Sequence, residues 1–493
     1  MSNKIDFAVV TKEKESLLFH SDAVKKQHDD GKKTAYERIE LLLDEHSFVE
    51  MYAMLSKCSG PAGVVTGYGT IDSRPVYVFA QDYTVNGGAI NQAQATKITK
   101  LLKTALSTGA PVVAILDSAG VALDEGVKAM EAYAQIYAAL SELSGICPTL
   151  AVVAGACFGG AAIIAQLCDI SIGIKGISQL SMYGPQVVSA LYHKEVSLDA
   201  LAGTAAANAQ GAYALVADNE EDALYFAKKA LSLLPDCNAD YALYEETADL
   251  NKQISLPENA SAHEILLQLS DEAAPLVLHA DYEPAVLTSL TRVGGHAVAL
   301  ILTDAQHNEG LLTEGALNKA ARFVSFADSF NLPIVSVLHT KGLDIPDVQQ
   351  QIGLVKAQGR LIYNYTSASV PKIALITGAV YGQAYVAMAS KSNSDMVFAL
   401  PEAVLSALAP EAAIQVVWQN RIKESRLPVA EAKEAIAADY VAEKASSIVA
   451  AKCGLLDDIV EPAYARMHIV SALEMLAAKS VSGFSKKQGN LPF

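Results

Sequence analysis

The sequence predicts an α/β protein built from two homologous halves, and two observations carry this prediction. First, residues 95–120 are similar to residues 317–342, and residues 147–162 are similar to residues 370–385, at an offset of 222 or 223 positions throughout. Second, helical patterns alternate with short strands that are apolar on both faces, which is typical of α/β layers rather than of a β-sandwich. Two separate pairs of similar segments with the same offset indicate an internal duplication. The matching anchors are Lys97, Pro111, Pro148 and Gly159 in the first copy and Lys319, Pro333, Pro371 and Gly382 in the second.

Each half is expected to contain the same elements in the same order. An amphipathic helix leads into a buried strand, and a further helix precedes a second strand, which ends in a glycine turn that opens another helix. A helical segment precedes the first half, and an amphipathic helix closes the second. A polar stretch after Pro235 separates the halves, which gives two domains, 1–240 and 241–493. The expected ranges are 97–106, 112–116 and 155–165 in the first half, 319–330, 334–338 and 378–389 in the second, and 37–44 and 464–478 for the flanking helices.

The composition excludes several classes of protein. Of 493 residues, 51% are hydrophobic and 18% charged, which provides apolar material for packed cores and excludes a disordered or fibrous chain. The formal net charge of −17 argues against nucleic acid or an anionic membrane as a partner. The six cysteines include no C-x-x-C pair and no histidine at zinc-finger spacing. We therefore expect no metal site and free thiols in a reducing cytoplasm.

Neither a signal peptide nor a membrane span is expected. The apolar run at 7–10 is short and flanked by charged residues. Residues 150–165 are almost wholly apolar, but Gly155, Gly159 and Gly160 interrupt them, whereas a transmembrane helix needs about 18 to 20 apolar residues. This segment is therefore predicted to be a buried strand, a glycine turn and a buried helix, and the protein is expected to be cytoplasmic.

The turn at Gly159 and Gly160 is the first candidate site. The N–H groups at such a strand-to-helix turn have no intrahelical partner and lie at the positive end of the helix dipole. Two of them beside a developing oxyanion form an oxyanion hole. Alternatively the glycines only permit close packing of helix and strand, which is the usual explanation for an isolated Gly-Gly pair. The recurrence of the turn at Gly382, followed by Gln383 and Ala384, favours a pair of functional sites.

Several motifs then occur along the chain in a fixed order. They are GKKTAYERI from Gly31, SFVE from Ser47, GYGTIDSRPV from Gly67, QDYTVNGG from Gln81, KAARFV from Lys319 and DIVEPAYAR from Asp458. Together they resemble the carboxyltransferase (β-type) subunits of biotin-dependent acyl-CoA carboxylases and related decarboxylases, such as propionyl-CoA carboxylase β and methylmalonyl-CoA decarboxylase α. The resemblance runs from about residue 30 to the C-terminus.

The resemblance implies two tandem crotonase-like (ClpP/crotonase) domains. Acyl-CoA is then expected to bind the N-terminal domain (1–240), and biotin to face the C-terminal domain (241–493). By transfer, the amides of Gly159 and Gly160 hold the thioester enolate, and those of Gln383 and Ala384 hold the carboxybiotin oxygen. No side-chain base is implied, because biotin freed of its carboxyl group takes the α-proton. Further binding residues implied by the resemblance are Gly87, Gly88, Ala119, Gly120, Phe158, Gly382 and Tyr385.

The resemblance also implies a substrate, a cofactor and partners. The substrate is a coenzyme A thioester, with propionyl- and methylmalonyl-type groups as the default, and the cofactor is biotin. The chain lacks a biotinyl-lysine motif, so the biotin is expected on a separate carrier protein. The implied assembly is a homo-oligomer, a hexamer formed as a dimer of trimers. It acts with biotin carboxyl carrier and biotin carboxylase subunits or within a decarboxylase complex. The direction of the reaction stays open.

The chain also departs from the family's usual pattern. Gln383 replaces a glycine; it keeps its N–H group, so an oxyanion contact survives if φ is negative there and fails if a positive φ is needed. Two alternative functions therefore stay open. One is a catalytically reduced paralogue that serves as an assembly or regulatory subunit in a hetero-oligomer. The other is a biotin-independent crotonase-type acyl-CoA enzyme. The remaining departures are Ala119, Ala122, His339, Val386, Ala409 and Ala412.

Other candidates have two interpretations each. His339, at a strand end, is either catalytic or hydrogen-bonded to backbone. Asp124 and Glu125 are either a carboxylate pair for adding water to an enoyl thioester or a solvated helix start. The lysine pairs at 32–33 and 228–229 either meet coenzyme A phosphates or lie on a solvated helix face.

Overall fold

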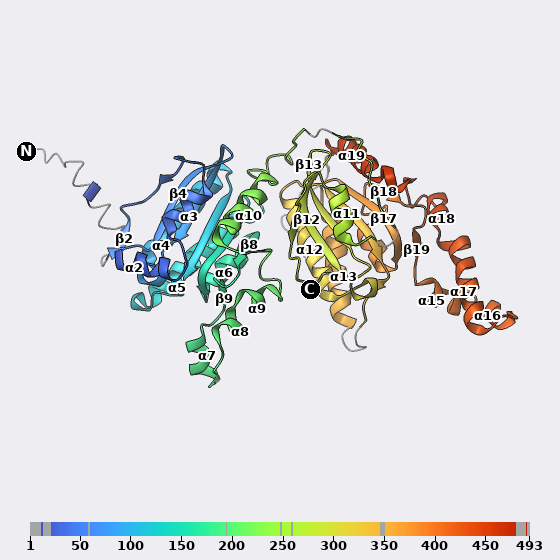
Figure 1. Cartoon of the computed structure of the whole chain (residues 1–493), viewed down its shortest axis with the longest axis horizontal. Coiled ribbons are helices and arrows are strands. Elements are labelled where there is room, and N and C mark those ends of the chain that lie inside the picture. The colour runs from blue at the N-terminus through green and yellow to red at the C-terminus, as the bar shows by residue number, and fades with distance from the viewer. Residues whose placement is uncertain are drawn as a thin grey trace, which may run out of the picture. The chain divides into compact units, whose positions relative to one another are not determined.

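The computed structural model describes residues 11–12, 21–57, 60–193, 195–246, 249–257, 260–345, 351–479 and 490. The apolar run at 7–10 and Cys58 lie outside these residues. The chain divides into two units, Met1–Asp240 and Tyr241–Phe493, which Figure 1 draws in blue to green and in green to red.

The first unit is built around one mixed sheet. Its strands follow the order β1 (Val49–Glu50), β4 (Val64–Ile71), β5 (Arg74–Gln81), β6 (Val112–Ser118), β7 (Thr149–Phe158), β8 (Ile170–Ile174) and β10 (Leu215–Ala217), with β9 (Gln179–Ser181) also paired to β7. β4 and β5 form an antiparallel hairpin, and β5, β6, β7, β8 and β10 are mutually parallel. β2 (Ser56–Lys57) and β3 (Gly60–Pro61) form a separate ribbon.

Helices cover both faces of this sheet. In β6, Val112, Ala114 and Leu116 pack in one core cluster with α4, α5 and α6, whereas the alternate residues Val113 and Ile115 are equally buried and so face the other layer. α3 and α10 contact each other and the strands, and supply that layer. The helical elements are α2 (Ser21–Asp29), α3 (Ala35–Leu42), η1 (Asn86–Gly88), α4 (Gln92–Thr108), η2 (Leu123–Glu125), α5 (Val127–Leu143), α6 (Gly160–Leu167), α7 (Pro185–Tyr192), α8 (Leu198–Ala202), α9 (Thr204–Asn208) and α10 (Glu220–Ser232).

The second unit repeats this topology. Its sheet has the order β11 (Leu276–Leu278), β12 (Val286–Val293), β13 (His296–Thr303), β15 (Ile334–Thr340), β17 (Lys372–Tyr381), β18 (Met396–Ala399) and β20 (Asp458–Ile459), with β19 (Val404–Ser406) paired to β17. β14 (Leu311–Leu312) and β16 (Gly342–Leu343) form a ribbon. The helical elements are α11 (Ala262–Leu269), η3 (Asn308–Gly310), α12 (Glu314–Ser329), α13 (Gln351–Ser367), α14 (Gln383–Met388), α15 (Pro410–Val417), α16 (Gln419–Glu424), α17 (Val429–Tyr440), η5 (Val441–Ala445), α18 (Ser447–Lys452), η6 (Pro462–Tyr464) and α19 (Ala465–Leu476).

Two parallel-rich sheets with one strand order confirm the predicted α/β class and the internal duplication. The expected strands at 112–116 and 334–338 lie within β6 and β15. The apolar segment 150–165 is divided between β7 and α6, with Gly155 inside the strand rather than at the turn. Within the described part of the chain, no helix is long and apolar enough to span a bilayer.

Candidate functional site

Strand β7 changes partners along its length, and this change places the turn at its end. The register between β6 and β7 shifts between Leu116 and Ser118. Before the shift β7 pairs with β8, and after it residues 156–158 pair with β9. At the shift the Asp117 carboxylate lies over Gly155, where a Cβ would come within 2.1 Å of Asp117 Oδ1. Glycine at 155 therefore lets β7 pass beneath Asp117 and continue to Gly159.

Asp117 is fully buried in a cluster of ion pairs. Arg38 places Nη1 3.1 Å from Asp117 Oδ2 and Nη2 2.9 Å from Glu220 Oε1, and Lys32 Nζ lies 3.1 Å from Asp117 Oδ2. Burial lowers the pKa of the Arg38 guanidinium, but the two carboxylates outweigh burial and raise it. Lys32 precedes α3 and is ion-paired, so the prediction of a solvated helix face for it is wrong, and its ammonium group is already engaged.

The predicted binding residues of the first half lie together at the carboxyl end of this sheet. The Ala119 N–H group donates to Gly87 O at 2.8 Å. A Cβ on Gly120 would lie 3.7 Å from Phe158 O, so this loop runs beside the end of β7. Gly88 has φ +63°, and its Cβ would lie 2.1 Å from a carbonyl oxygen of β6. Only glycine fits this close approach.

The turn leaves two backbone donors free, and Gly160 of the predicted pair is one of them whereas Gly159 is not. Gly159 has φ +60°, and its N–H group donates to Ser181 O at 3.0 Å, so this N–H group is already used. Gly160 and Ala161 are the first residues of α6, where N–H groups have no intrahelical acceptor. Gly159 therefore forms the bend, and Gly160 and Ala161 carry the available donors.

The second half has the same turn. Gly382 has φ +58° and donates its N–H group to Ser406 O at 2.9 Å. Gln383 and Ala384 begin α14 as Gly160 and Ala161 begin α6, and Gln383 has a negative φ. The exposed side chain of Gln383 is therefore compatible with the backbone, and its N–H group is retained. Of the predicted residues in this half, Gly382, Gln383, Ala384 and Tyr385 are consecutive in the turn and helix.

The remaining candidates have mainly structural contacts. His339 lies in β15 with its ring over Gly378, where a Cβ would come within 2.7 Å of the ring, just as Asp117 lies over Gly155. Glu125 lies in η2, and its Oε2 accepts the Gln92 N–H group at 2.8 Å, which caps α4. Glu125 is thus a helix cap rather than an acid–base residue.

Two tyrosines of α5 contact the first turn and were not predicted. Tyr137 donates its hydroxyl group to Gly160 O at 3.0 Å, and burial raises the pKa of Tyr137 to about 12, which keeps it protonated. The Tyr133 ring lies against Gly160, where a Cβ would be 2.3 Å from the ring. The two rings stack with centroids 5.8 Å apart. Their spacing of four residues placed them on one helix face, but no local motif connected them to Gly160.

Gln358 of α13 makes the corresponding contact in the second half. Its side chain is 6% exposed, and its Nε2 donates to Gln383 O at 2.7 Å. Gln358 Oε1 is buried and has no hydrogen-bond partner, and the same holds for Tyr385 Oη and Ser406 Oγ. Buried polar atoms are normally paired, so three unpaired ones on elements around one turn indicate a site that a ligand or water completes.

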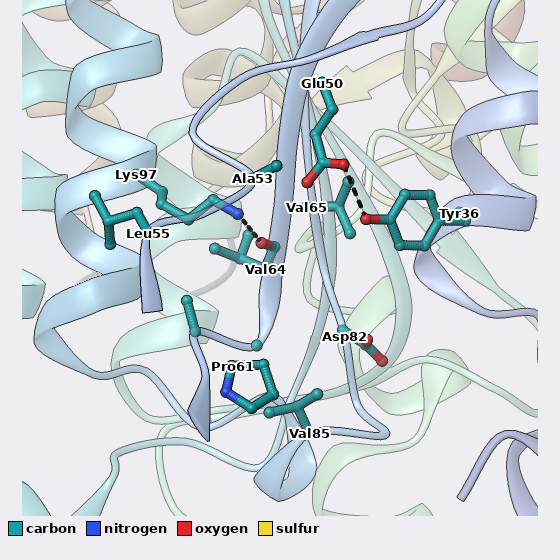
Figure 2. Close-up of a pocket in the computed structure, with 12 residues that line it drawn as sticks. Tyr36, Glu50, Ala53, Leu55, Pro61, Val64, Val65, Asp82, Val85 and Lys97 are labelled. Carbon is teal, nitrogen blue, oxygen red and sulfur yellow. Dashed lines mark hydrogen bonds between the residues drawn. The ribbon is translucent and has the colours of Figure 1, made fainter. Parts of the chain in front are cut away.

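The repeated lysines have structural roles. Figure 2 shows Lys97, from α4, reaching the carbonyl group of Val64 on β4 at 2.8 Å, beside the Tyr36–Glu50 hydrogen bond. The cavity between them measures about 30 Å³, which suits water rather than a substrate. Lys319 likewise donates to backbone carbonyl groups, and burial lowers the pKa of Lys319 to about 8.

No cluster of three or more histidine, cysteine, aspartate or glutamate side chains among the described residues is arranged to hold a metal ion. Cys157, which directly precedes the turn, is fully buried, and burial raises the pKa of its thiol, so it is no nucleophile at neutral pH. The first turn therefore offers neutral backbone donors.

The fold is a duplicated α/β fold, and unpaired amide donors lie at the ends of two matching strands. These features define a class of enzyme that stabilises anionic oxygens during acyl-group chemistry. The match to known proteins is more specific. Residues 26–491 match the carboxyl transferase domain family. The chain belongs to this family, and its fold is the tandem crotonase-like fold that the resemblance implied.

The relatives match over the whole chain. The methylmalonyl-CoA decarboxylase subunit alpha of Propionigenium modestum is 33% identical over 514 residues, covering 100% of this chain and 99% of the relative. The methylmalonyl-CoA carboxyltransferase 12S subunit of Propionibacterium freudenreichii subsp. shermanii is 35% identical over 491 residues, covering 95% and 93%. The crystal structure of transcarboxylase 12S, a hexamer assembly with methylmalonyl-coenzyme A and methylmalonic acid bound, has a TM-score of 0.94 at 33% identity and covers 100% of this chain and 99% of that one.

Proposed function

We propose that this carboxyltransferase moves a carboxyl group between carboxybiotin and the α-carbon of a short-chain acyl-CoA of the propionyl or methylmalonyl type. The observation that carries the proposal is the duplicated turn, in which a glycine with positive φ is followed by two backbone N–H groups without acceptors. Two anionic oxygens arise in such a transfer, one on the thioester enolate and one on the urea ring. The chain has one pair of donors for each.

The first-half pair is assigned to the thioester. Gly160 and Ala161 donate to the enolate oxygen, and Gly159 shapes the turn, since its own N–H group is bonded to Ser181. The loop of Ala119 and Gly120 lies beside these donors and lines the acyl-CoA site. An oxyanion donor of this kind is typically worth about 3 to 4 kcal/mol in the transition state.

The second-half pair is assigned to biotin. The N–H groups of Gln383 and Ala384 hold the ureido oxygen, and the unpaired acceptor Gln358 Oε1 and the Tyr385 hydroxyl group fit a ligand that carries both N–H and C=O groups. Carboxybiotin held there would supply the carboxyl group and, through its urea ring, a base for the α-proton of the thioester. The chain itself contributes orientation, fixed dipoles and exclusion of water.

The partners follow from the same proposal. The protein acts in the cytoplasm as a homohexamer, a dimer of trimers, with the acyl-CoA half (1–240) of one subunit facing the biotin half (241–493) of another. Its partners are a separate biotin carboxyl carrier and either a biotin carboxylase or a decarboxylase complex.

The test is transfer of ¹⁴C from a carboxylated biotin carrier to a panel of acyl-CoAs, with and without avidin. We expect label on propionyl-CoA and full inhibition by avidin. Acyl-CoA binding without transfer to any acceptor would refute the proposal in favour of the catalytically reduced paralogue, and avidin-insensitive turnover would refute it in favour of the biotin-independent enzyme. Gln383 has a negative φ and keeps its N–H group, as the transferase function requires.

A further inference from the structure

We infer that Tyr137 and Gln358 are positioning residues that hold and polarise the peptide groups carrying the active N–H donors of the two turns. This inference rests on the proposed function of those turns. It extends that function by assigning to each turn one side chain that supports its backbone donors. Substituting one of these side chains should then affect only the thioester step or only the biotin step of the transfer.

The geometry of one peptide group connects Tyr137 to an active donor. Gly160 O and the Ala161 N–H group belong to one planar unit and point in opposite directions. The Tyr137 hydroxyl group donates to Gly160 O at 3.0 Å. A hydrogen bond on the oxygen fixes the plane of the unit and draws electron density toward that oxygen, which makes the opposite N–H group a stronger donor.

The second half makes the same contact with a different residue. Gln358 Nε2 donates to Gln383 O at 2.7 Å, and this carbonyl group shares its peptide plane with the Ala384 N–H group. Tyr137 and Gln358 lie 221 positions apart, whereas the anchors of the duplication lie 222 or 223 apart, and their side chains share no chemistry. A phenol and an amide that donate to matching carbonyl groups from matching helices point to a shared role for the contact.

The Gln358 side-chain amide has one bonded and one unbonded polar atom. Gln358 is 94% buried, and Nε2 must face Gln383 O, because a flipped amide would set two oxygens against each other. Oε1 is then left buried and unpaired. A buried acceptor without a partner costs stability, so a glutamine at this position is explained by the hydrogen bond that its Nε2 donates to Gln383 O.

The experiment uses Tyr137→Phe and Gln358→Met, each with a matched control in the same unit. Tyr225→Phe removes the hydroxyl group of an exposed tyrosine on α10, and Gln351→Met makes the same exchange as Gln358→Met at an exposed position of α13. Thermal unfolding of all four variants reports folding. If Gln358→Met fails to fold, Gln358→Glu also removes the donor while keeping the shape of the side chain.

The first readout is equilibrium binding to the assembled protein. One probe is propionyl-CoA, and the other is a coenzyme A analogue whose nitronate group mimics the planar enolate. We expect Tyr137→Phe to weaken nitronate binding about 5- to 10-fold, the loss of roughly one hydrogen bond, and to leave propionyl-CoA binding within 2-fold. We expect Tyr225→Phe and Gln358→Met to leave the binding of both probes within 2-fold of wild type.

The second readout is the breakdown of ¹⁴C-carboxylated biotin carrier in the absence of acyl-CoA. We expect Gln358→Met to slow it about 5- to 10-fold, and Tyr137→Phe and Gln351→Met to leave it within 2-fold. Equal losses from Tyr225→Phe and Tyr137→Phe, or the same loss in both readouts from one variant, would overturn the inference. A wild-type protein that does not prefer the nitronate to propionyl-CoA would instead overturn the proposed function, so the two failures are distinguishable.

Discussion

Replacing Gly160 with alanine tests whether the first turn is held by Tyr133. Gly160 has no positive φ, so its backbone accepts alanine. The added Cβ would lie 2.3, 2.5 and 2.5 Å from three atoms of the Tyr133 ring, far inside van der Waals contact. Overpacking typically lowers the free energy of unfolding by about 1 to 3 kcal/mol. We expect about 3 kcal/mol here, because three atoms of the Tyr133 ring overlap the new Cβ and the ring is stacked against Tyr137. The turn must then shift, and we expect carboxyl transfer to fall at least about 100-fold.

A double-mutant cycle separates the overlap from other effects. Tyr133→Ala removes the ring, so adding Gly160→Ala in that background should cost less than about 1 kcal/mol, which gives a coupling energy of about 2 kcal/mol. Circular dichroism during urea unfolding measures stability, while the fluorescence of Trp418, the chain's single tryptophan, reports the second unit separately. Additive effects of the two substitutions would refute the reasoning, because they would show that Gly160 is needed for a reason unrelated to the ring.

Three further predictions concern other sites. Arg38→Met leaves Glu220 buried without its cation and Asp117 paired with Lys32 alone. It should destabilise the first unit by about 3 kcal/mol in urea unfolding, and a loss below about 1 kcal/mol would contradict this. The Gln383→Gly variant should transfer carboxyl groups at a rate within about 3-fold of the wild-type rate, since the N–H group is kept. A rate more than about 10-fold above that of wild type would show that the glutamine side chain obstructs the site. Burial raises the pKa of Glu37, but hydrogen bonds from the N-cap threonine and from a histidine outweigh burial and lower this pKa to about 2. The ionised Glu37 side chain therefore stabilises the fold fully above its unfolded pKa of about 4.5. This stabilisation is lost as the pH falls toward 2. Glu37→Gln should therefore lower the unfolding midpoint at pH 7 and have a smaller effect at pH 4, and an equal effect at both would contradict this.

The fold was predictable because its signals are local or periodic. The spacing of Pro148 and Gly159 recurs at Pro371 and Gly382, since each pair bounds a strand and its turn in both copies. The recurrence of Lys97 also has a structural cause, because its buried ammonium group binds a carbonyl group of the neighbouring strand, a role that an amphipathic helix pattern did not reveal.

The site was only partly predictable, because its decisive contacts are distant in sequence. The use of the Gly159 N–H group depends on Ser181, in a strand that pairs only after β7 has shifted its register. The ion pair of Lys32 with Asp117 spans 85 positions. No sequence motif singles out Tyr137, whose contact with Gly160 depends on how α5 packs against α6.

At each turn a single glycine forms the bend, which leaves the backbone of the next position open to substitution. Gly382 alone adopts the left-handed backbone, so the codon after it is free to change without dismantling the donors that follow. Position 383 holds an exposed glutamine in one copy, while its counterpart Gly160 is fixed by a neighbouring ring. Single substitutions at position 383 can therefore change the second turn during evolution, while the first turn stays constant at Gly160.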